Sequence, residues 1–341
     1  MDGCDLSTIL YYDYRFDLNP EAINRETRVV IIMEEAGKKT FLGLEENENG
    51  PYDIVILPIP YEMTTSYKEG TEFGPEACIS ASSQVELFDE LLDDDLPCGF
   101  KLFTSDNWNN EVSSLKEALE SIERFSSKWV NGEQFPIFLG GEHGILLPII
   151  RSLKKHPKIE GELEKLTIVQ IDAHADLRDQ LNGERFSHGT VIRRSLDEGV
   201  GKIIQIGVRA YCSEEKEIIE SDGRVNTWFA RDLISIDSES SNWNEMINQI
   251  KNLSGPIWLS FDIDGLDGIL VPATGTPVPG GLSFWGANKI IQELFNAKKS
   301  QVIGADVNEI STSPDTNLTE FSAALIATKI MACHIMSTKE Q

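Results

Sequence analysis

The sequence predicts an α/β protein built in three layers, with helices covering both faces of a mostly parallel central sheet. From about residue 52 onward, short apolar runs alternate with segments that show helical periodicity. Continuous apolar runs of this length are typical of strands buried on both faces, as in parallel sheets. The composition also suits a packed core, because 40% of the residues are hydrophobic and 25% are charged.

The predicted elements follow from these patterns in chain order. Apolar runs predict strands at 53–58, 136–139, 166–171, 202–208, 256–261 and 301–307. Apolar residues at three- and four-residue steps predict helices at 115–129, 146–155, 244–253, 285–297 and 320–336. Residues 1–50 are expected to form an N-terminal extension, in which we consider a hairpin of 28–35 with 39–44. Residues 51–341 are expected to form a single domain.

The charge balance narrows the classes of partner. The chain has 30 Lys+Arg against 56 Asp+Glu, which gives a formal net charge of −26. Nucleic-acid binding relies on clustered basic residues that neutralise phosphates, so we do not expect it. No apolar run reaches the roughly 18 residues of a membrane span, and the start of the chain lacks the features of a signal peptide. We therefore expect a cytoplasmic protein without a nucleic-acid or membrane partner.

Histidines and aspartates gather directly after predicted strands. The motif Gly-Gly-Glu-His-Gly at 140–144 follows one strand, Asp-Ala-His-Ala-Asp at 172–176 follows another, and Asp-Ile-Asp-Gly-Leu-Asp at 262–267 follows a third. Charged groups at the carboxyl ends of parallel strands meet in the crevice where open α/β sheets bind ligands. A further histidine, His188, lies in a Ser-His-Gly-Thr context. The three motifs are therefore expected to share one site.

The second and third motifs predict a metal site. Residues two apart in an extended segment point to the same face, so Asp172, His174 and Asp176 would project together if the strand continued, as would Asp262 and Asp264. Uncompensated charges beside buried strands cost on the order of several kcal/mol each, so a positive group is expected among them. Imidazole and carboxylate ligands suit Mn²⁺, Zn²⁺, Ni²⁺ or Fe²⁺.

The number of ligands favours two ions rather than one. Together with His143, the motifs supply two histidines and four aspartates, which is more than one tetrahedral ion requires. Two divalent ions carry +4 and four aspartates carry −4, so the charges balance. A water between two such ions would ionise near neutral pH and become the nucleophile of a hydrolase.

In this order, the three motifs resemble those of the ureohydrolases, the arginase and agmatinase family. The resemblance extends from about residue 58 to residue 336 and includes the Gly- and Pro-rich segment 272–281. The segments 61–75 and 183–188 look like the agmatinase branch. Gly144, Gly268 and Ala273 depart from the residues usual in the family. The resemblance implies an arginase-like fold, with 51–341 as a single catalytic domain.

The resemblance also implies how the metal ligands are shared. One ion would be held by His143, Asp172, Asp176 and Asp262, and the second by Asp172, His174, Asp262 and Asp264. Asp172 and Asp262 would bridge the pair. Manganese is usual in the family, and Ni²⁺, Fe²⁺ or Zn²⁺ are alternatives.

Two further residues take implied roles in the reaction. The resemblance places Glu309 opposite the guanidinium group of the substrate, where a carboxylate can accept two parallel hydrogen bonds. It makes His188 the proton-transfer residue, because imidazole titrates near the working pH.

The implied activity is hydrolysis of a guanidino compound to urea and an amine, with agmatine giving putrescine as the leading case. A net charge of −26 favours such a cationic substrate. Arginine is less favoured because 177–186 lacks the Ser-Gly-Asn run of arginases. Aminopropylagmatine, guanidinobutyrate and guanidine remain alternatives.

Two hypotheses come from other functional classes. A metal-dependent deacetylase normally uses a single zinc, and the ligand set here argues against it. A non-catalytic, polyamine-binding homologue would not need the intact ligands. By analogy with the family, we expect a homo-oligomer, either a trimer or a hexamer.

Overall fold

The computed structural model describes residues 39–46, 49–109, 111–234 and 241–339. Its centre is an eight-stranded sheet in the order β4-β1-β5-β10-β9-β6-β7-β8, in which all neighbouring strands are parallel. The strands are β1 (Ile54–Ile59), β4 (Leu102–Thr104), β5 (Phe135–Gly140), β6 (Thr167–Ile171), β7 (Lys202–Val208), β8 (Val225–Phe229), β9 (Gly255–Asp262) and β10 (Ser300–Asn308).

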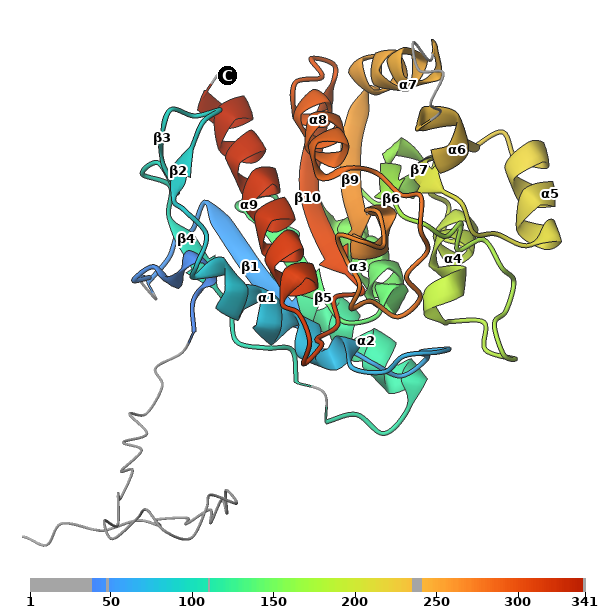
Figure 1. Ribbon diagram of the computed structural model, residues 1–341, viewed down its shortest axis with the longest axis horizontal. Helices are drawn as coiled ribbons and strands as arrows, with labels where there is room; N and C mark the ends of the chain where they lie inside the picture. The colour runs from blue at the N-terminus through green and yellow to red at the C-terminus, as the bar shows by residue number, and fades with distance from the viewer. Residues whose placement is uncertain (1–38, 47–48, 110, 235–240, 340–341) are drawn as a thin grey trace, which may run out of the picture. The chain divides into compact units, whose positions relative to one another are not determined.

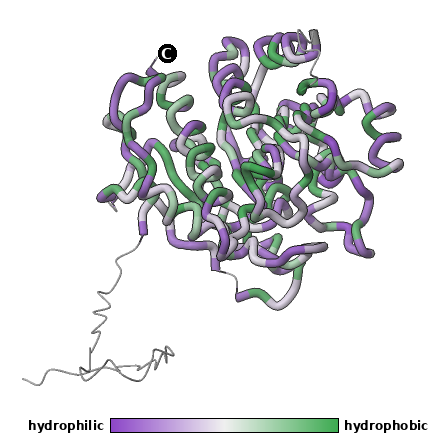
Figure 2. Tube along the Cα trace, in the orientation of Figure 1, coloured by the Kyte–Doolittle hydropathy of each residue, from purple (hydrophilic) through white to green (hydrophobic). Residues whose placement is uncertain are grey.

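Helices cover both faces of this sheet, which confirms the predicted three-layer α/β fold (Figure 1). They are α1 (Gly74–Ser82), α2 (Leu115–Ser126), α3 (Leu146–Ser152), α4 (Val191–Asp197), α5 (Ser213–Ser221), α6 (Ala230–Leu233), α7 (Ser241–Lys251), α8 (Phe284–Phe295) and α9 (Leu318–Lys339). On β1, Ile56 packs in the cluster beneath α1, α7, α8 and α9, whereas its neighbour Val55 packs beneath α2, α3 and α4. Successive strand residues point to opposite faces, so one apolar run fills two cores. Figure 2 shows the hydrophobic residues concentrated on the central strands.

Helix α9 is the most apolar of the outer elements. Among the described residues it is the one helix long and apolar enough, by length and composition, to cross a membrane. In the fold, 67% of that apolar window is buried, and the helix contacts α1, α8 and β10. Burial of this kind is typical of a core helix in a soluble protein.

From residue 51 onward, every predicted strand and helix is present, with small shifts at the ends. The sequence patterns did not reveal β4, β8, α1, α4, α5 or α6. Strand β4 has three residues and β8 has one buried position, so neither forms a long apolar run. Both strands are at the edges of the sheet, where burial on two faces is not required.

The segment 39–44 differs from the hairpin strand expected there. It contains the short 3₁₀ helix η1 (Phe41–Gly43), whose Phe41 is fully buried. The backbone N–H of Phe41 donates to Thr104 Oγ1 at 2.9 Å, which joins η1 to the end of β4. The other arm of the expected hairpin, 28–35, lies outside the described residues.

The strand order brings four carboxyl ends together at the centre of the sheet. Strands β5, β10, β9 and β6 are neighbours in the sheet, although they are far apart in the sequence. Their ends lead to His143, Glu309, Asp262 and Asp172 respectively. The strand order alone therefore places these four predicted site residues next to one another along one edge of the sheet.

His334 on α9 provides a stability test that does not involve the site. Its ring stacks on Phe135 with 4.0 Å between centroids, and burial lowers the pKa of His334 from 6.5 to about 4. The unfolded chain therefore binds one more proton than the folded chain between these values, and stability is lost as the pH falls through this window. We expect His334→Phe to remove up to about 2 kcal/mol of the destabilisation at pH 5. Urea unfolding of both proteins at pH 5 and pH 7.5 measures this, and equal pH dependence would contradict it.

Candidate active site

The carboxyl ends of the central strands surround a pocket of about 320 Å³. Its floor contains His143, His174, Asp176, Asp262 and Asp264, together with Glu309. Its walls come from the segment 65–68, the segments around Arg178 and His188, Tyr211 and Gly275-Thr276. Residues from all three sequence motifs thus line one pocket.

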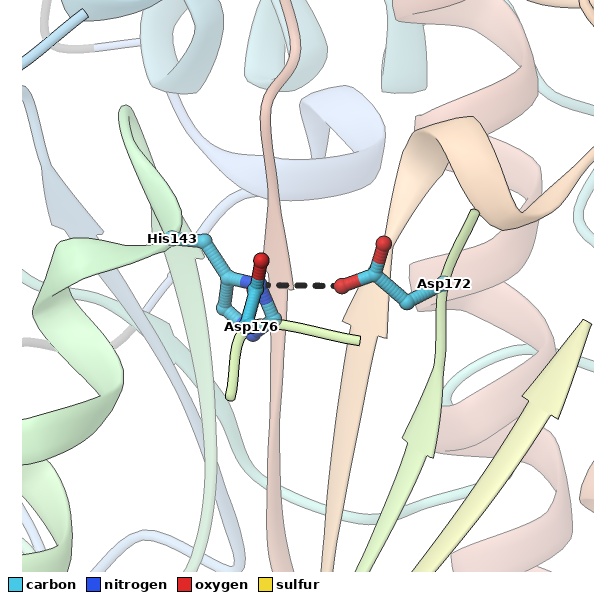
Figure 3. Close-up of side chains that lie close together, drawn as sticks. All are labelled: His143, Asp172 and Asp176. Atoms are coloured by element: carbon cyan, nitrogen blue, oxygen red, sulfur yellow. Dashed lines mark ion pairs between the residues drawn. The ribbon is translucent and has the colours of Figure 1, made fainter. Parts of the chain in front are cut away.

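The first ligand group is centred on the His143 ring. His143 Nδ1 lies 3.0 Å from Asp176 Oδ2, 3.2 Å from Asp172 Oδ2 and 3.5 Å from Asp262 Oδ2. Figure 3 shows the carboxylates of Asp172 and Asp176 close to this ring. The ring is 1% exposed, and Nδ1 has no hydrogen-bond partner. A buried, unpartnered ring nitrogen facing three carboxylates suits a metal ion.

The second ligand group is centred on His174. His174 Nδ1 lies 3.0 Å from Asp264 Oδ2 and 3.6 Å from Asp172 Oδ1. Asp172 therefore presents one oxygen to His143 and the other to His174. The two sets that could each hold an ion, His143–Asp172–Asp176 and Asp172–His174–Asp264, share this aspartate. Asp262 contacts a member of each set. Its Oδ2 lies 3.5 Å from His143 Nδ1, and its Oδ1 accepts the Asp264 backbone N–H at 2.9 Å.

Asp172, His174 and Asp176 do not project together as an extended strand would place them. Asp176 has a backbone φ of 52°, a left-handed conformation that is uncommon outside glycine. The chain therefore turns after β6, and Asp176 joins His143 while His174 reaches the second group. Such strained positions are concentrated at functional sites.

The charges in this cluster are unbalanced in the protein alone. Burial and the neighbouring Asp172 raise the pKa of Asp176 to about 7. Burial, Asp264 and Asp172 raise the pKa of Asp262 well above its ordinary range. Although burial opposes it, Asp264 and Asp172 raise the pKa of His174 to about 12. Carboxylates that resist ionisation and histidines that hold protons indicate missing positive charge, which divalent cations would supply.

Glu309 lies at the end of β10, beside the first group. Its Oε1 accepts the backbone N–H of His143 at 2.7 Å, and its backbone φ is 58°. Burial, followed by the charge of Glu142, raises the pKa of Glu309 to about 8. A buried carboxylate that lines a pocket without a counter-ion suits a cationic ligand.

His188 lies on the wall of the pocket, in the short 3₁₀ helix η6 (His188–Thr190). Its Nδ1 is 3.3 Å from Thr64 Oγ1, and its Nε2 is 3.4 Å from Ser66 Oγ. Burial and the charges of His174 and His143 lower the pKa of His188 to about 4. The ring is therefore neutral near pH 7, whereas we expected an imidazole that titrates near the working pH.

Comparison with known proteins shows which family the chain belongs to. A family model described as the arginase family matches residues 52–333. The chain belongs to the arginase family. An N(1)-aminopropylagmatine ureohydrolase from Synechocystis sp. is 34% identical, over 87% of this chain and 94% of that protein. An agmatinase from Pyrococcus horikoshii is 36% identical, over 80% of this chain and 88% of that protein. The solved agmatine ureohydrolase of Thermoplasma volcanium matches with a TM-score of 0.71 and 26% identity, covering 86% of this chain and 94% of its own.

One departure from the usual residues of the arginase family has a structural reason. A Cβ atom at Gly144 would lie 2.9 Å from Cε1 of Tyr61, whose ring is 1% exposed. Tyr61 thus occupies the space that a serine or threonine side chain would need at position 144. The neighbouring Gly141 is also required, because a Cβ there would lie 2.0 Å from the Tyr61 carbonyl oxygen.

This arginase-family site also contains supporting residues that the sequence patterns did not reveal. His143 Nε2 lies 2.8 Å from Ser260 Oγ, which donates to Asp306 Oδ2 at 2.7 Å. Gln170 donates to Asp172 Oδ2 at 2.7 Å, and Arg209 donates to the Asp264 carbonyl at 2.7 Å. Partners of this kind orient ligand side chains. The available signal was the isolated polar residue inside an apolar strand, as at Gln170, Ser260 and Asp306.

Proposed function

We propose that this protein hydrolyses a guanidino compound to urea and an amine, and that agmatine is its substrate. The observation that carries the proposal is the placement of His143 and His174 on two sides of Asp172, with Glu309 in the same pocket. A buried carboxylate can accept two parallel hydrogen bonds from a planar guanidinium. Membership of the arginase family and the similarity to an agmatinase support the same reaction.

We propose Mn²⁺ as the native metal, since the donor set of imidazole and carboxylate suits it as well as Ni²⁺, Fe²⁺ or Zn²⁺. His143, Asp172, Asp176 and Asp262 would hold one ion, and Asp172, His174, Asp262 and Asp264 would hold the other. The unpartnered Nδ1 of His143 supports this assignment. Such a pair, when bound, supplies a water that ionises near neutral pH.

The remaining steps are proposed for the protein's own side chains. Glu309 holds the guanidinium head at the floor of the pocket and keeps its carbon in one position. The reaction consumes one water, breaks the bond between that carbon and the tail nitrogen, and yields urea and a protonated amine. The amine needs a proton to leave, and we assign the uptake and delivery of this proton to His188, which lines the pocket.

A panel of substrates tests the proposal. Urea release by the Mn²⁺-loaded protein would be measured with agmatine, aminopropylagmatine, guanidinobutyrate, guanidine and arginine, and acetate release with an acetylpolyamine. We expect the highest specificity constant with agmatine. A higher constant with another guanidino compound would replace agmatine, and no urea from any of them would overturn the proposed reaction.

We also propose that the protein is a cytoplasmic homo-oligomer, a trimer or a hexamer. This proposal rests on the family alone. Light scattering of the purified protein in solution measures its mass, and a monomer would contradict it.

Glu309→Gln tests the guanidinium contact. The substitution keeps the shape but removes the charge and one acceptor, so substrate positioning should suffer while metal content stays unchanged. Loss of one charge-assisted hydrogen bond costs about 1.5–3 kcal/mol, or roughly ten- to a hundred-fold in specificity constant. Glu293→Gln removes a buried glutamate that pairs with Lys289 outside the pocket, and provides the control. A wild-type specificity constant for Glu309→Gln would show that the guanidinium is held elsewhere.

A further inference from the structure

Glu142 is a buried acid beside the site that none of the proposed steps uses. It lies between β5 and His143, it is 0% exposed, and both of its carboxylate oxygens are occupied by the segment 63–65. We infer that Glu142, acting through Thr64, holds His188 in the tautomer that carries its hydrogen on Nδ1. This inference, which rests on the proposed function, makes Glu142 and Thr64 positioning residues for proton transfer.

The first step concerns the backbone of the segment 61–70, which belongs to none of the assigned helices or strands. Glu142 Oε1 accepts the backbone N–H groups of Met63, Thr64 and Thr65, the last two at 2.5 Å and 3.1 Å. The backbone N–H of Glu142 in turn donates to the Tyr61 carbonyl at 2.8 Å. One carboxylate therefore replaces the hydrogen bonds that a regular element would provide. The adjoining residues 65–68 line the pocket, so their placement depends on it.

The second step concerns the Thr64 hydroxyl, which has one hydrogen to donate. It donates this hydrogen to Glu142 Oε2. The other oxygen of the same carboxylate, Oε1, accepts three backbone N–H groups, so Glu142 has no hydrogen to return and the direction of this bond is fixed. Thr64 Oγ1 can then act only as an acceptor toward every other neighbour.

The third step concerns His188. Its backbone N–H donates to Thr64 Oγ1 at 3.2 Å, and its Nδ1 lies 3.3 Å from the same oxygen. Since Thr64 Oγ1 only accepts, Nδ1 must be the ring nitrogen that carries the hydrogen. Nε2 is then the unprotonated nitrogen, and Ser66 Oγ at 3.4 Å can donate to it. In the proposed function, Nε2 is then the nitrogen that takes up the proton.

The Glu142 carboxylate has a second use once the ring takes up a proton. Its Oε2, which accepts the Thr64 hydroxyl, lies 3.8 Å from His188 Nδ1. An imidazolium formed by proton uptake at Nε2 would face this negative charge. The same side chain thus sets the tautomer of the resting ring and offers a negative charge to its protonated form.

Thr64→Val tests the two hydrogen bonds that link Glu142 to His188 through Thr64, because valine keeps the shape of threonine and lacks the hydroxyl. We expect kcat to fall about 10–100-fold, with a much smaller change in KM and with unchanged metal content. Thr64→Ser retains the hydroxyl and should restore most of the rate. Thr71→Val is the matched control, because Thr71 makes a similar buried hydroxyl bond, to Glu62 at 2.9 Å, without contacting His188.

Nitrogen chemical shifts provide a readout that does not depend on turnover. They would be recorded on ¹⁵N-histidine-labelled protein loaded with diamagnetic Zn²⁺, with the His188 signals assigned from a His188→Asn sample. We expect hydrogen on Nδ1 in the wild type and in Thr64→Ser, and a mixture of tautomers in Thr64→Val and Glu142→Gln. Hydrogen on Nε2 in the wild type, or a wild-type kcat for Thr64→Val, would overturn the inference. A protein that released no urea but kept the Nδ1 hydrogen would contradict the proposed function alone.

Discussion

Asp172→Asn is expected to abolish urea release and to remove metal from both ligand groups. Asp172 is the residue that the two groups share, with one oxygen toward His143 and the other toward His174. Asparagine keeps the shape but supplies one oxygen and no charge. Metal ions contribute several kcal/mol of transition-state stabilisation, and each 1.4 kcal/mol is tenfold in rate, so turnover should fall by about 10³-fold or more.

Asp264→Asn provides the graded comparison for this variant. Of the two histidines, Asp264 pairs with His174 alone, so its loss should weaken one ion and leave the other in place. Metal content by mass spectrometry and the thermal shift on Mn²⁺ addition measure both variants alongside the wild type. If Asp172→Asn kept two ions and normal turnover, the shared-ligand assignment would be wrong.

His188→Ala is expected to lower turnover by about 10²–10⁴-fold, the usual contribution of a proton-transfer group. Its ring touches Thr64 and Ser66 rather than any of the six proposed ligands by hydrogen bond, so metal content should not change. Added imidazole should restore part of the rate in the cavity left by the side chain. Steady-state kinetics with and without imidazole, together with metal analysis, measure these effects.

His334→Phe removes a histidine that does not line the pocket and should leave turnover at the wild-type level. This control separates a local effect of His188 from a general effect of losing a buried imidazole. Unchanged turnover of His188→Ala across the pH range would exclude His188 from proton transfer.

The central strands and most of the proposed ligands could be predicted because two sequence signals coincide: an apolar run, and a group of polar residues directly after it. Strands β5, β6, β9 and β10 are continuous apolar runs, and each is followed directly by polar residues such as Asp172 or Glu309. Parallel strands place these ends on one edge of a sheet. The order of the strands, which makes β10 a neighbour of β5, could not be obtained from the same patterns.

The remaining features depend on contacts between residues that are distant in the sequence. An extended continuation of β6 would place Asp176 beside His174, but its left-handed backbone turns it toward His143, the histidine with which the family resemblance groups it. Glu142 and Thr64 are separated by 78 positions, and no local pattern indicates that the Thr64 hydroxyl donates to the Glu142 carboxylate. Edge strands such as β8, with a single buried residue, leave no apolar run to recognise.

Anomalous diffraction from crystals of the Mn²⁺-loaded protein tests the central claim most directly, because it locates the ions without reference to activity. Data collected on both sides of the manganese absorption edge should give two peaks, one on each side of Asp172. The first should be ligated by His143 and Asp176, and the second by His174 and Asp264. A single peak, or two peaks that do not share Asp172, would contradict the account.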